Sequence, residues 1–151
     1  MQVLLQRVTE VSVTVENAVV GKIGRGLLVF VCAEHGDTET ISSKLLEKIL
    51  KLRIFSDEAG KMNHSVQDIN GALLIVSQFT LAADTSKGTR PSFGRAAAPE
   101  QARLLYGSFV EQARVSGVPV QTGIFAADMK VALINDGPVT IPLSMSPAGN
   151  I

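Results

Sequence analysis

The chain has only one cysteine and no net charge. Each of these features excludes a class of protein. A single cysteine cannot form an internal disulfide, and Cys32 lies in an apolar run, which favours a buried space-filling thiol over a nucleophile. Fourteen Lys and Arg balance fourteen Asp and Glu, so the basic character of a strong nucleic-acid binder is missing. Any nucleic acid must therefore be bound by a local group of cations.

Several sequence signals are also missing. No apolar run reaches the roughly 18 residues that a membrane span requires, and the first residues lack the basic and apolar segments of a secretion signal. We therefore expect a cytoplasmic protein without a membrane partner. Glycine-rich nucleotide loops and paired Cys or His ligands are absent, which predicts no cofactor and no metal. His35 and His64 lie in separate polar turns and are predicted to be surface histidines.

The composition that remains suits a folded domain. Hydrophobic residues make up 46% of the 151 residues and charged residues 19%, which is enough apolar material for a core. Chains usually divide into domains only beyond roughly 250 residues, so we expect one domain over residues 1–151.

Hydrophobic periodicity predicts strands in the first third of the chain. Apolar residues alternate with polar ones over 3–5 and 11–15, and a second strand is expected over 19–23 after a turn at Asn17 and Ala18. The continuous apolar run over 27–33 predicts a strand buried on both faces. We expect these strands to form a three-stranded meander.

Two helices and further strands follow. Helical spacing of apolar residues predicts a helix over 38–53, with Asp37 or Thr38 as its N-cap, and a second helix that begins at Pro99. A buried strand is expected over 72–76, and the tail is expected to form an antiparallel hairpin around 135–138. The predicted fold class is α+β: one domain, a twisted, mostly antiparallel and barrel-like sheet, and two helices.

Polar residues end the buried strand of 72–76 in the order Ser77, Gln78, Phe79 and Thr80. Backbone N–H groups leave the hydrogen-bond ladder where a strand ends, so they become free to bind a ligand. In an extended chain Ser77 and Thr80 point to opposite faces, so a site that uses both hydroxyls requires a bend. A strand that simply leaves the core through its polar end is the alternative.

A second unusual segment is Asn135-Asp136-Gly137-Pro138-Val139-Thr140. The bond before proline tolerates the cis form at a cost of about 0.5–1 kcal/mol, so this turn can aim two successive carbonyls the same way. From the pattern alone, a plain hairpin turn is the favoured interpretation, because Asp-Gly and Gly-Pro are common in turns.

Together the two segments resemble the paired signatures of the D-aminoacyl-tRNA deacylase family. The similarity extends through MQVLLQRVTEVSV, LRIFSDEAGKMN, LIVSQFTLAADTSKGTRPSF and FAADMKVALINDGPVTI. It implies a homodimer in which a cis Gly137-Pro138 reaches into the partner's site, and it adds Met129 to the substrate-binding residues. The two carbonyls would bind the substrate ammonium and exclude an L side chain by overlap. Glycine escapes this filter, so glycyl-tRNA is an expected substrate.

The resemblance places the aminoacyl group against the catalytic segment Ser77, Gln78, Phe79 and Thr80, and two mechanisms compete. Thr80 could attack the ester, but the sequence offers no evident base for it. Alternatively, N–H groups around Gln78 and Phe79 bind the oxyanion while a ribose hydroxyl helps water attack, which we favour.

Three cations, Lys87, Arg90 and Arg95, follow the first motif in a Gly/Pro/Ser-rich loop. The resemblance favours contacts with phosphates of the tRNA acceptor end, although surface cations are usually only solvated. The helix over 38–53, with Lys44, Lys48 and Lys51, is a weaker second candidate. Competing functions are a dimeric protein that binds D-amino acids without turnover, and a general serine or threonine esterase.

Overall fold

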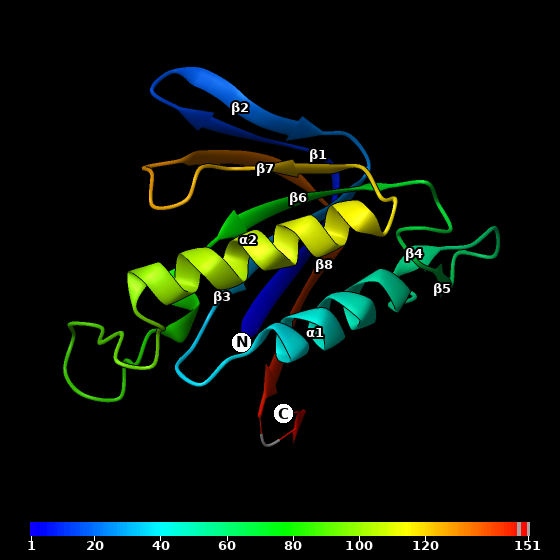
Figure 1. Cartoon of the computed structure of the whole chain (residues 1–151). Coiled ribbons are helices and arrows are strands. Elements are labelled where there is room, and N and C mark those ends of the chain that lie inside the picture. Colours follow the sequence, from blue (N-terminus) through cyan, green and yellow to red (C-terminus); the bar gives the residue numbers. More distant parts are fainter. Residues whose placement is uncertain (148, 151) are drawn as a thin grey trace.

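A long first strand, β1 (Gln2–Val15), organises the sheet in this computed structural model, which describes residues 1–147 and the backbone of 149–150. One edge of β1 pairs antiparallel with β3 (Gly26–Cys32) and then with β2 (Ala18–Ile23), as Figure 1 shows. The predicted meander is therefore wrong. Because β2 and β3 share one edge of β1, they do not pair with each other.

The other edge of β1 pairs antiparallel with β8 (Lys130–Ser146). Beyond β3 the sheet continues with two parallel neighbours, β6 (Ala72–Ser77) and β7 (Val120–Thr122). The backbone of β9 (Gly149–Asn150) pairs with β8, and β4 (Phe55–Ser56) and β5 (Met62–His64) form a separate small hairpin. The predicted α+β class with a mostly antiparallel sheet is confirmed.

The sheet curls until its two flanks nearly meet. β2 and β7 share no hydrogen-bond ladder, yet a Cβ added to Gly21 of β2 would lie only 2.4 Å from the carbonyl oxygen of Thr122 in β7. Real Cβ atoms do not approach backbone so closely, so glycine permits this contact between two main chains. The barrel-like shape predicted from the sequence follows from this approach.

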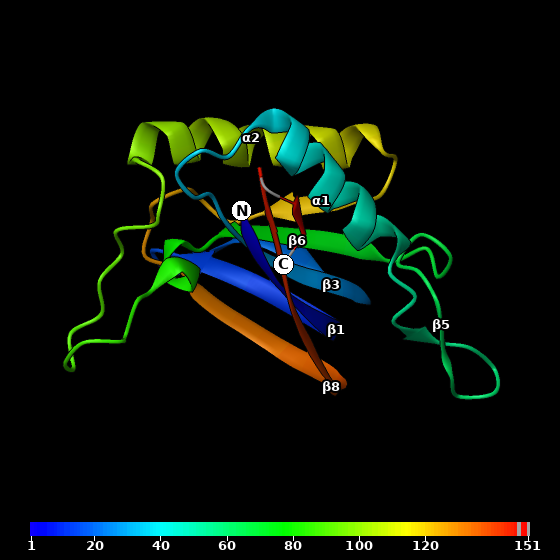
Figure 2. The ribbon, with the colours of Figure 1, turned by 90° about the horizontal axis from the view of Figure 1, so that it is seen from below.

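Both predicted helices are present on one face of the sheet (Figures 1 and 2). α1 (Glu39–Lys51) begins at Thr38, whose hydroxyl accepts a hydrogen bond from the Ile41 N–H at 3.3 Å. α2 (Pro99–Val115) begins at Pro99, which needs no hydrogen-bond acceptor in the first turn. The N-terminal ammonium of Met1 is buried beneath α1, where it donates to Asp37 at 2.8 Å and to the Met145 carbonyl at 2.7 Å.

Apolar side chains form two separate clusters. The larger cluster fills the space between the sheet and the helices and includes Leu5, Leu45, Ile75 and Phe109. The smaller one lies on the other face of the sheet and consists of Val8, Val11, Val13, Ile23, Leu28, Leu74 and Val76. β6 therefore buries its side chains on both faces, as predicted for the run over 72–76.

The tail differs from its prediction, because β8 is one continuous strand and not a hairpin. Both of its halves pair with β1: Gln6 lies opposite Thr140, and Val8 lies opposite Asn135. Only Arg7 stands opposite the four residues 136–139, which therefore bulge from the ladder. A single long partner strand keeps the two halves collinear, so the turn-like residues produce a bulge without reversing the chain.

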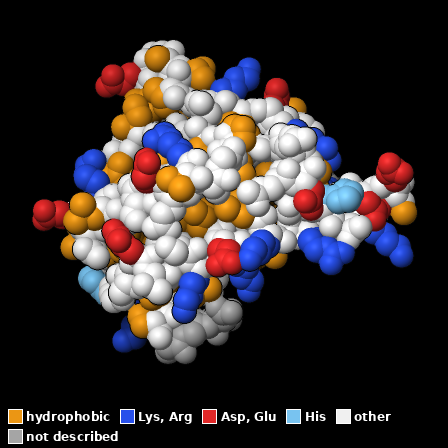
Figure 3. Space-filling model, turned by 45° about the vertical axis from the view of Figure 1, so that its right-hand side comes forward, with side chains coloured by type: hydrophobic (Ala, Val, Ile, Leu, Met, Phe, Trp, Pro, Cys, Tyr) orange, Lys and Arg blue, Asp and Glu red, His pale blue; other side chains and the backbone are white. Residues whose placement is uncertain are grey.

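The surface carries interspersed charges. On the face in Figure 3, acidic and basic side chains alternate and neither sign forms a continuous patch. None of the described helices is both long and apolar enough to cross a membrane. The cytoplasmic location stays a prediction.

Candidate active site

The polar end of β6 turns sharply where the sequence predicted that a bend would be needed. Ser77 is its last residue, and the Gln78 N–H extends the ladder by donating to the Val31 carbonyl at 2.8 Å. The chain then enters a short 3-10 turn, η1 (Phe79–Ala82). Because the Gln78 N–H is occupied, the N–H groups of Phe79 and Thr80 are the ones without a backbone acceptor in the described chain.

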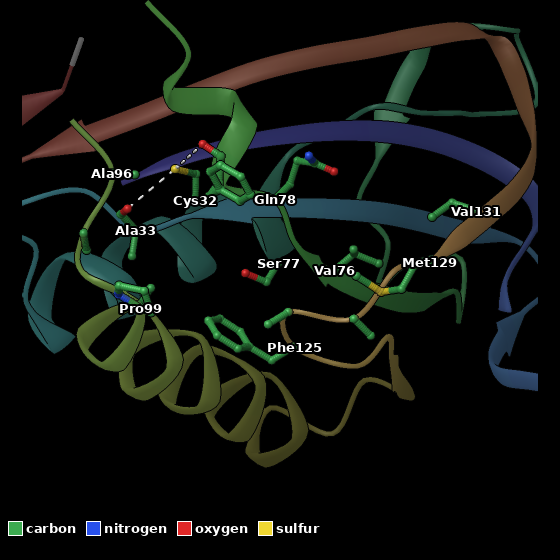
Figure 4. Close-up of a pocket in the computed structure, with 15 residues that line it drawn as sticks. Cys32, Ala33, Val76, Ser77, Gln78, Ala96, Pro99, Phe125, Met129 and Val131 are labelled. Carbon is green, nitrogen blue, oxygen red and sulfur yellow. Dashed lines mark hydrogen bonds between the residues drawn. The ribbon is translucent and has the colours of Figure 1, made fainter. Parts of the chain in front are cut away.

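This turn borders a cavity of about 480 Å³. Figure 4 shows the Ser77 hydroxyl pointing into it between Pro99 and Phe125. Four of the predicted site residues line it, namely Ser77, Gln78, Phe79 and Met129. The other lining residues are Cys32, Ala33, Val76, Ala96, Ala97, Pro99, Ala102, Phe125, Ala126, Ala127 and Val131. An apolar pocket with few polar groups is typical of a small-molecule or substrate site.

Thr80 lies outside this cavity. It is exposed, and its hydroxyl accepts a hydrogen bond from the side-chain amide of Gln78. An amide cannot take a proton from a hydroxyl, so this described partner of Thr80 cannot act as the base that a nucleophilic hydroxyl needs. Neither histidine lines the cavity in the described structure, since His64 belongs to the distant β4–β5 hairpin and His35 precedes α1.

The wall opposite β6 is supported from behind by α2. Phe125 packs against Tyr106, with ring centres 5.9 Å apart, and the Arg103 guanidinium lies 4.5 Å from the centre of the Phe125 ring. The Ile75 carbonyl accepts hydrogen bonds from the Tyr106 hydroxyl at 2.7 Å and from the Gly123 N–H at 3.3 Å. Burial raises the pKa of the Tyr106 phenol to about 12, so this hydrogen-bond donor stays protonated at neutral pH.

Cys32 is buried at the edge of the cavity, as the sequence predicted. Its thiol lies 3.5 Å from the Ala33 carbonyl oxygen and 3.6 Å from that of Phe79. Burial, followed by the neighbouring Glu34 carboxylate, raises the pKa of this thiol to about 11. A thiol that stays protonated at neutral pH is a poor nucleophile, so Cys32 serves as part of the wall.

The three predicted cations lie on the basic loop (residues 83–97), which projects from the body between η1 and α2 (Figure 2). Lys87 and Arg90 are exposed near its tip. Arg95 is near its base, in a shallow depression beside Asp84 and Ser86, and its guanidinium is 4.0 Å from Glu34. All three are accessible to a ligand that reaches the cavity from this side.

The second motif does not meet the first within one chain. Gly137 and Pro138 are exposed in the β8 bulge, and neither lines the cavity. The bond between them is cis. Asn135 closes the bulge, because its side chain accepts from the Val139 N–H at 2.7 Å and donates to the Thr140 hydroxyl at 2.9 Å.

A buried arginine that the sequence analysis missed holds this bulge. Arg7 is only 8% exposed, and it donates to the Asp136 carbonyl and to the Ile54 carbonyl, both at 2.8 Å. Its position carried a signal, because Arg7 continues the inward alternation of Val3 and Leu5. The apolar walls, such as Phe125 and Pro99, carried no comparable signal. Among the described residues, no group of three or more His, Cys, Asp or Glu is arranged to hold a metal.

The family model described as D-Tyr-tRNA(Tyr) deacylase matches residues 4–144 and so includes both motifs. The chain belongs to this family. Within the deacylase family, a D-aminoacyl-tRNA deacylase of Polaromonas sp. (strain JS666 / ATCC BAA-500) is 65% identical and aligns over 98% of this chain and 99% of its own length. One from Paracidovorax citrulli (strain AAC00-1) is 60% identical over 100% of this chain and 97% of its own length.

Solved structures support the same fold. The c-Myc DNA unwinding element binding protein superimposes with a TM-score of 0.90 at 42% identity, covering 95% of this chain and 98% of its own. A probable eukaryotic D-amino acid tRNA deacylase has a TM-score of 0.78 at 20% identity, covering 93% and 97%. Because its sequence identity is only 20%, this second structure supports the similarity of fold and nothing further.

Proposed function

We propose that this chain hydrolyses the ester of D-aminoacyl-tRNA and releases the free amino acid and the tRNA. The observation that carries the proposal is the apolar cavity of about 480 Å³ at the end of β6, which the Ser77 hydroxyl enters and which Gln78 and Phe79 also line. Membership of the deacylase family and the activity named for its close relatives support it. The neutral charge of the chain argues against general DNA binding.

In this proposal water attacks the ester directly. The oxygen of water bonds to the carbonyl carbon, the bond to the ribose oxygen breaks, and the departing oxygen takes a proton. The N–H groups of Phe79 and Thr80 are the available donors for the oxyanion, and one good donor contributes roughly 3–4 kcal/mol. An aminoacyl ester is already activated, so donors, positioning and a ribose hydroxyl that assists water are sufficient. The Thr80 hydroxyl, which faces an amide, is not the nucleophile.

The proposal includes a homodimer in which Gly137 and Pro138 enter the cavity of the partner. Two observations support this arrangement: both residues are exposed, and neither lines the cavity of its own chain. Two carbonyls delivered this way accept hydrogen bonds from the substrate ammonium and occupy the space of an L side chain. Met129 lines the same cavity and packs beside the substrate. Glycine has no side chain to exclude, so glycyl-tRNA is also cleaved.

Recognition of the tRNA acceptor end belongs to the basic loop in this proposal. Lys87, Arg90 and Arg95 are exposed on the loop that follows η1, the turn whose residue Phe79 lines the cavity. A few phosphate contacts suit an enzyme that samples many tRNAs and releases them, and they predict a shallow dependence of affinity on salt.

One experiment tests the function. The purified protein is incubated with D-tyrosyl-, L-tyrosyl- and glycyl-tRNA, and the remaining ester is measured over time. We expect rapid discharge of the D-tyrosyl and glycyl substrates and survival of the L-tyrosyl ester. Tight binding of free D-tyrosine without discharge would instead identify a non-catalytic binding protein, and equal discharge of both enantiomers would identify a general esterase.

A further inference from the structure

Two phenylalanine side chains form an exposed aromatic pair beside the cavity. The rings of Phe79 and Phe93 meet edge to face, with their centres 5.0 Å apart at 69°. Phe79 is 57% exposed and Phe93 is 37% exposed. Large aromatic side chains are usually buried, so a pair that packs together yet stays open to solvent indicates a binding surface.

The backbone holds Phe93 in place although it belongs to a projecting loop. Ser92 and Asp84 exchange two backbone hydrogen bonds, at 2.7 and 2.9 Å, which close the base of the basic loop. The Phe93 carbonyl accepts from the Ala96 N–H at 3.0 Å, and the Ala97 N–H donates to the Ala33 carbonyl at 3.0 Å. An anchored ring loses little conformational entropy when a ligand stacks on it.

The surroundings of the pair suit a nucleic acid. Lys87, Arg90 and Arg95 belong to the same loop as Phe93, and the Asp84 carboxylate is the acidic group among them, held by the Ser86 N–H at 2.9 Å. Aromatic faces interleaved with cations are typical of surfaces that bind single-stranded nucleic acids, because bases stack while phosphates meet the cations. Glu34, 4.0 Å from Arg95, adds a second carboxylate, so three cations still exceed two carboxylates, which favours a polyanion over an apolar peptide.

The position of the pair identifies which part of the tRNA it meets. Phe79 borders the cavity, whereas Phe93 lies outside it. Because the aminoacyl ester enters the cavity, we assign a base that stacks on the outer ring, Phe93, to a nucleotide that precedes the terminal nucleoside along the same strand.

The geometry points to a stacking platform formed by Phe79 and Phe93 for an unpaired base of the tRNA acceptor end, upstream of the terminal nucleoside. This inference rests on the proposed function and adds a subsite to it. The Phe93 ring binds substrate without taking part in bond breaking, so its loss raises KM and leaves kcat in place.

A fluorescence titration tests the platform without using catalysis. The chain has no tryptophan, so Phe93→Trp introduces a single indole at the platform. The variant is titrated with uncharged tRNA and with the same tRNA lacking its four unpaired 3′ nucleotides. We expect quenching by the intact tRNA and little or none by the shortened one. The matched control is Val115→Trp, an exposed position at the opposite end of α2, which should respond to neither.

The other outcomes of this titration contradict the inference. Equal quenching by both tRNAs would mean that the cations alone bind phosphates near the ring. Absence of quenching by both would mean that no base reaches it. Emission that shifts to the blue with protein concentration, without RNA, would mean that a second copy of the chain covers the pair.

Kinetics on D-tyrosyl-tRNA provide an independent test. Stacking on one aromatic side chain predicts a KM increase of roughly 5- to 100-fold for Phe93→Ala. Phe93→Leu, which keeps apolar bulk without a π face, should behave like the alanine variant, and Phe93→Tyr like the wild type. If the wild type discharges D-tyrosyl-tRNA and the alanine variant keeps its KM, the platform is wrong and the deacylase activity stands. If the wild type discharges nothing, the proposed function is wrong, and the fluorescence titration decides the platform alone.

Discussion

The segments 77–80 and 135–140 both interrupt strands with polar residues, yet the fold uses them in opposite ways. The first leaves a strand that is buried on both faces and borders a cavity of its own chain. The second bulges from β8 and presents Gly137 and Pro138 to solvent. The cavity beside 77–80 is therefore complete in a single chain. Gly137 and Pro138 are instead exposed, where another molecule can contact them.

The two segments also differ in what holds them. The end of β6 is fixed by backbone pairing, since Gln78 continues the ladder to β3. The bulge depends on two side chains. Arg7 donates a hydrogen bond to the Asp136 carbonyl, and the Asn135 side chain accepts the hydrogen bond from the Val139 N–H, which has left the ladder. Substitutions should therefore damage the bulge more easily than the strand end.

The largest effect on activity is expected when the cavity beside 77–80 and the bulge of 135–140 are disabled in different subunits. Ala102→Phe fills the cavity, and Gly137→Val places a side chain within 3.2 Å of Arg7 and closer still to Val139. Each variant alone should lose discharge of D-tyrosyl-tRNA. Mixed subunits should regain about a quarter of wild-type activity, because about half of the random dimers are mixed and each has one intact site.

The control for this mixing experiment is successive affinity purification through two different tags, one on each variant, which retains only mixed dimers and so shows that they have formed. If the mixture is no more active than the two variants measured separately, the two segments do not cooperate across subunits.

A smaller effect is expected at the support of the bulge. Arg7→Ala leaves the buried carbonyl of Ile54 and the partly buried carbonyl of Asp136 without this donor, so the free energy of unfolding should fall by about 3 kcal/mol. Urea unfolding followed by circular dichroism measures the change. The exposed Arg114→Ala is the control and should stay within about 0.5 kcal/mol of the wild type. Equal stability of the two variants would show that Arg7 does not hold the bulge.

A smaller loss of stability is expected when Tyr106 is changed in the wall of the cavity, because the Ile75 carbonyl keeps its hydrogen bond from the Gly123 N–H. Tyr106→Phe removes one hydroxyl and should lower the free energy of unfolding by about 1 kcal/mol at neutral pH. The raised pKa of Tyr106 favours the folded state below pH 10, the ordinary pKa of the phenol in the unfolded chain, and this advantage is lost as pH rises towards 12.

Tyr106 is the only tyrosine in the chain, so absorbance at alkaline pH reports its ionisation directly. The phenolate should appear with a midpoint of about 12 in the folded protein. A midpoint near 10 before unfolding begins would contradict the buried hydrogen bond to Ile75.

The smallest effect is expected at Thr80. Its hydroxyl lies outside the cavity and faces the Gln78 amide, so Thr80→Ala should keep kcat on D-tyrosyl-tRNA within about tenfold. Single-turnover kinetics measure the chemical step. A covalent acyl-enzyme trapped from the wild type and absent from the variant would establish Thr80 as the nucleophile after all.

Local patterns in the sequence predicted the elements better than their pairing. Alternation identified β1, continuous apolar runs identified β3 and β6, and helical spacing identified both helices, because the pattern of apolar residues follows the burial of each element. The meander and the tail hairpin were wrong because pairing depends on distant partners. β1 accepts two strands along one edge and all of β8 along the other, which no local window encodes.

The candidate site was predictable only where polar residues interrupt an apolar pattern. Ser77 and Gln78 stand out at the end of a buried strand, and Gly137-Pro138 stands out in an alternating tail. Phe125, Pro99 and the alanines of the cavity wall resemble ordinary core residues, so only the three-dimensional structure identifies them.

The close approach of Gly21 to Thr122 has a further consequence for the sheet. Because β2 and β7 touch without sharing a hydrogen-bond ladder, the barrel-like sheet has a junction that only main-chain contact and side-chain packing, such as that of Ile23, keep closed. Parting this junction breaks no ladder, so it costs less than opening the sheet anywhere else along its width. The smaller apolar cluster is therefore enclosed by a sheet that opens most easily between β2 and β7, and we expect solvent to reach the cluster first at that junction.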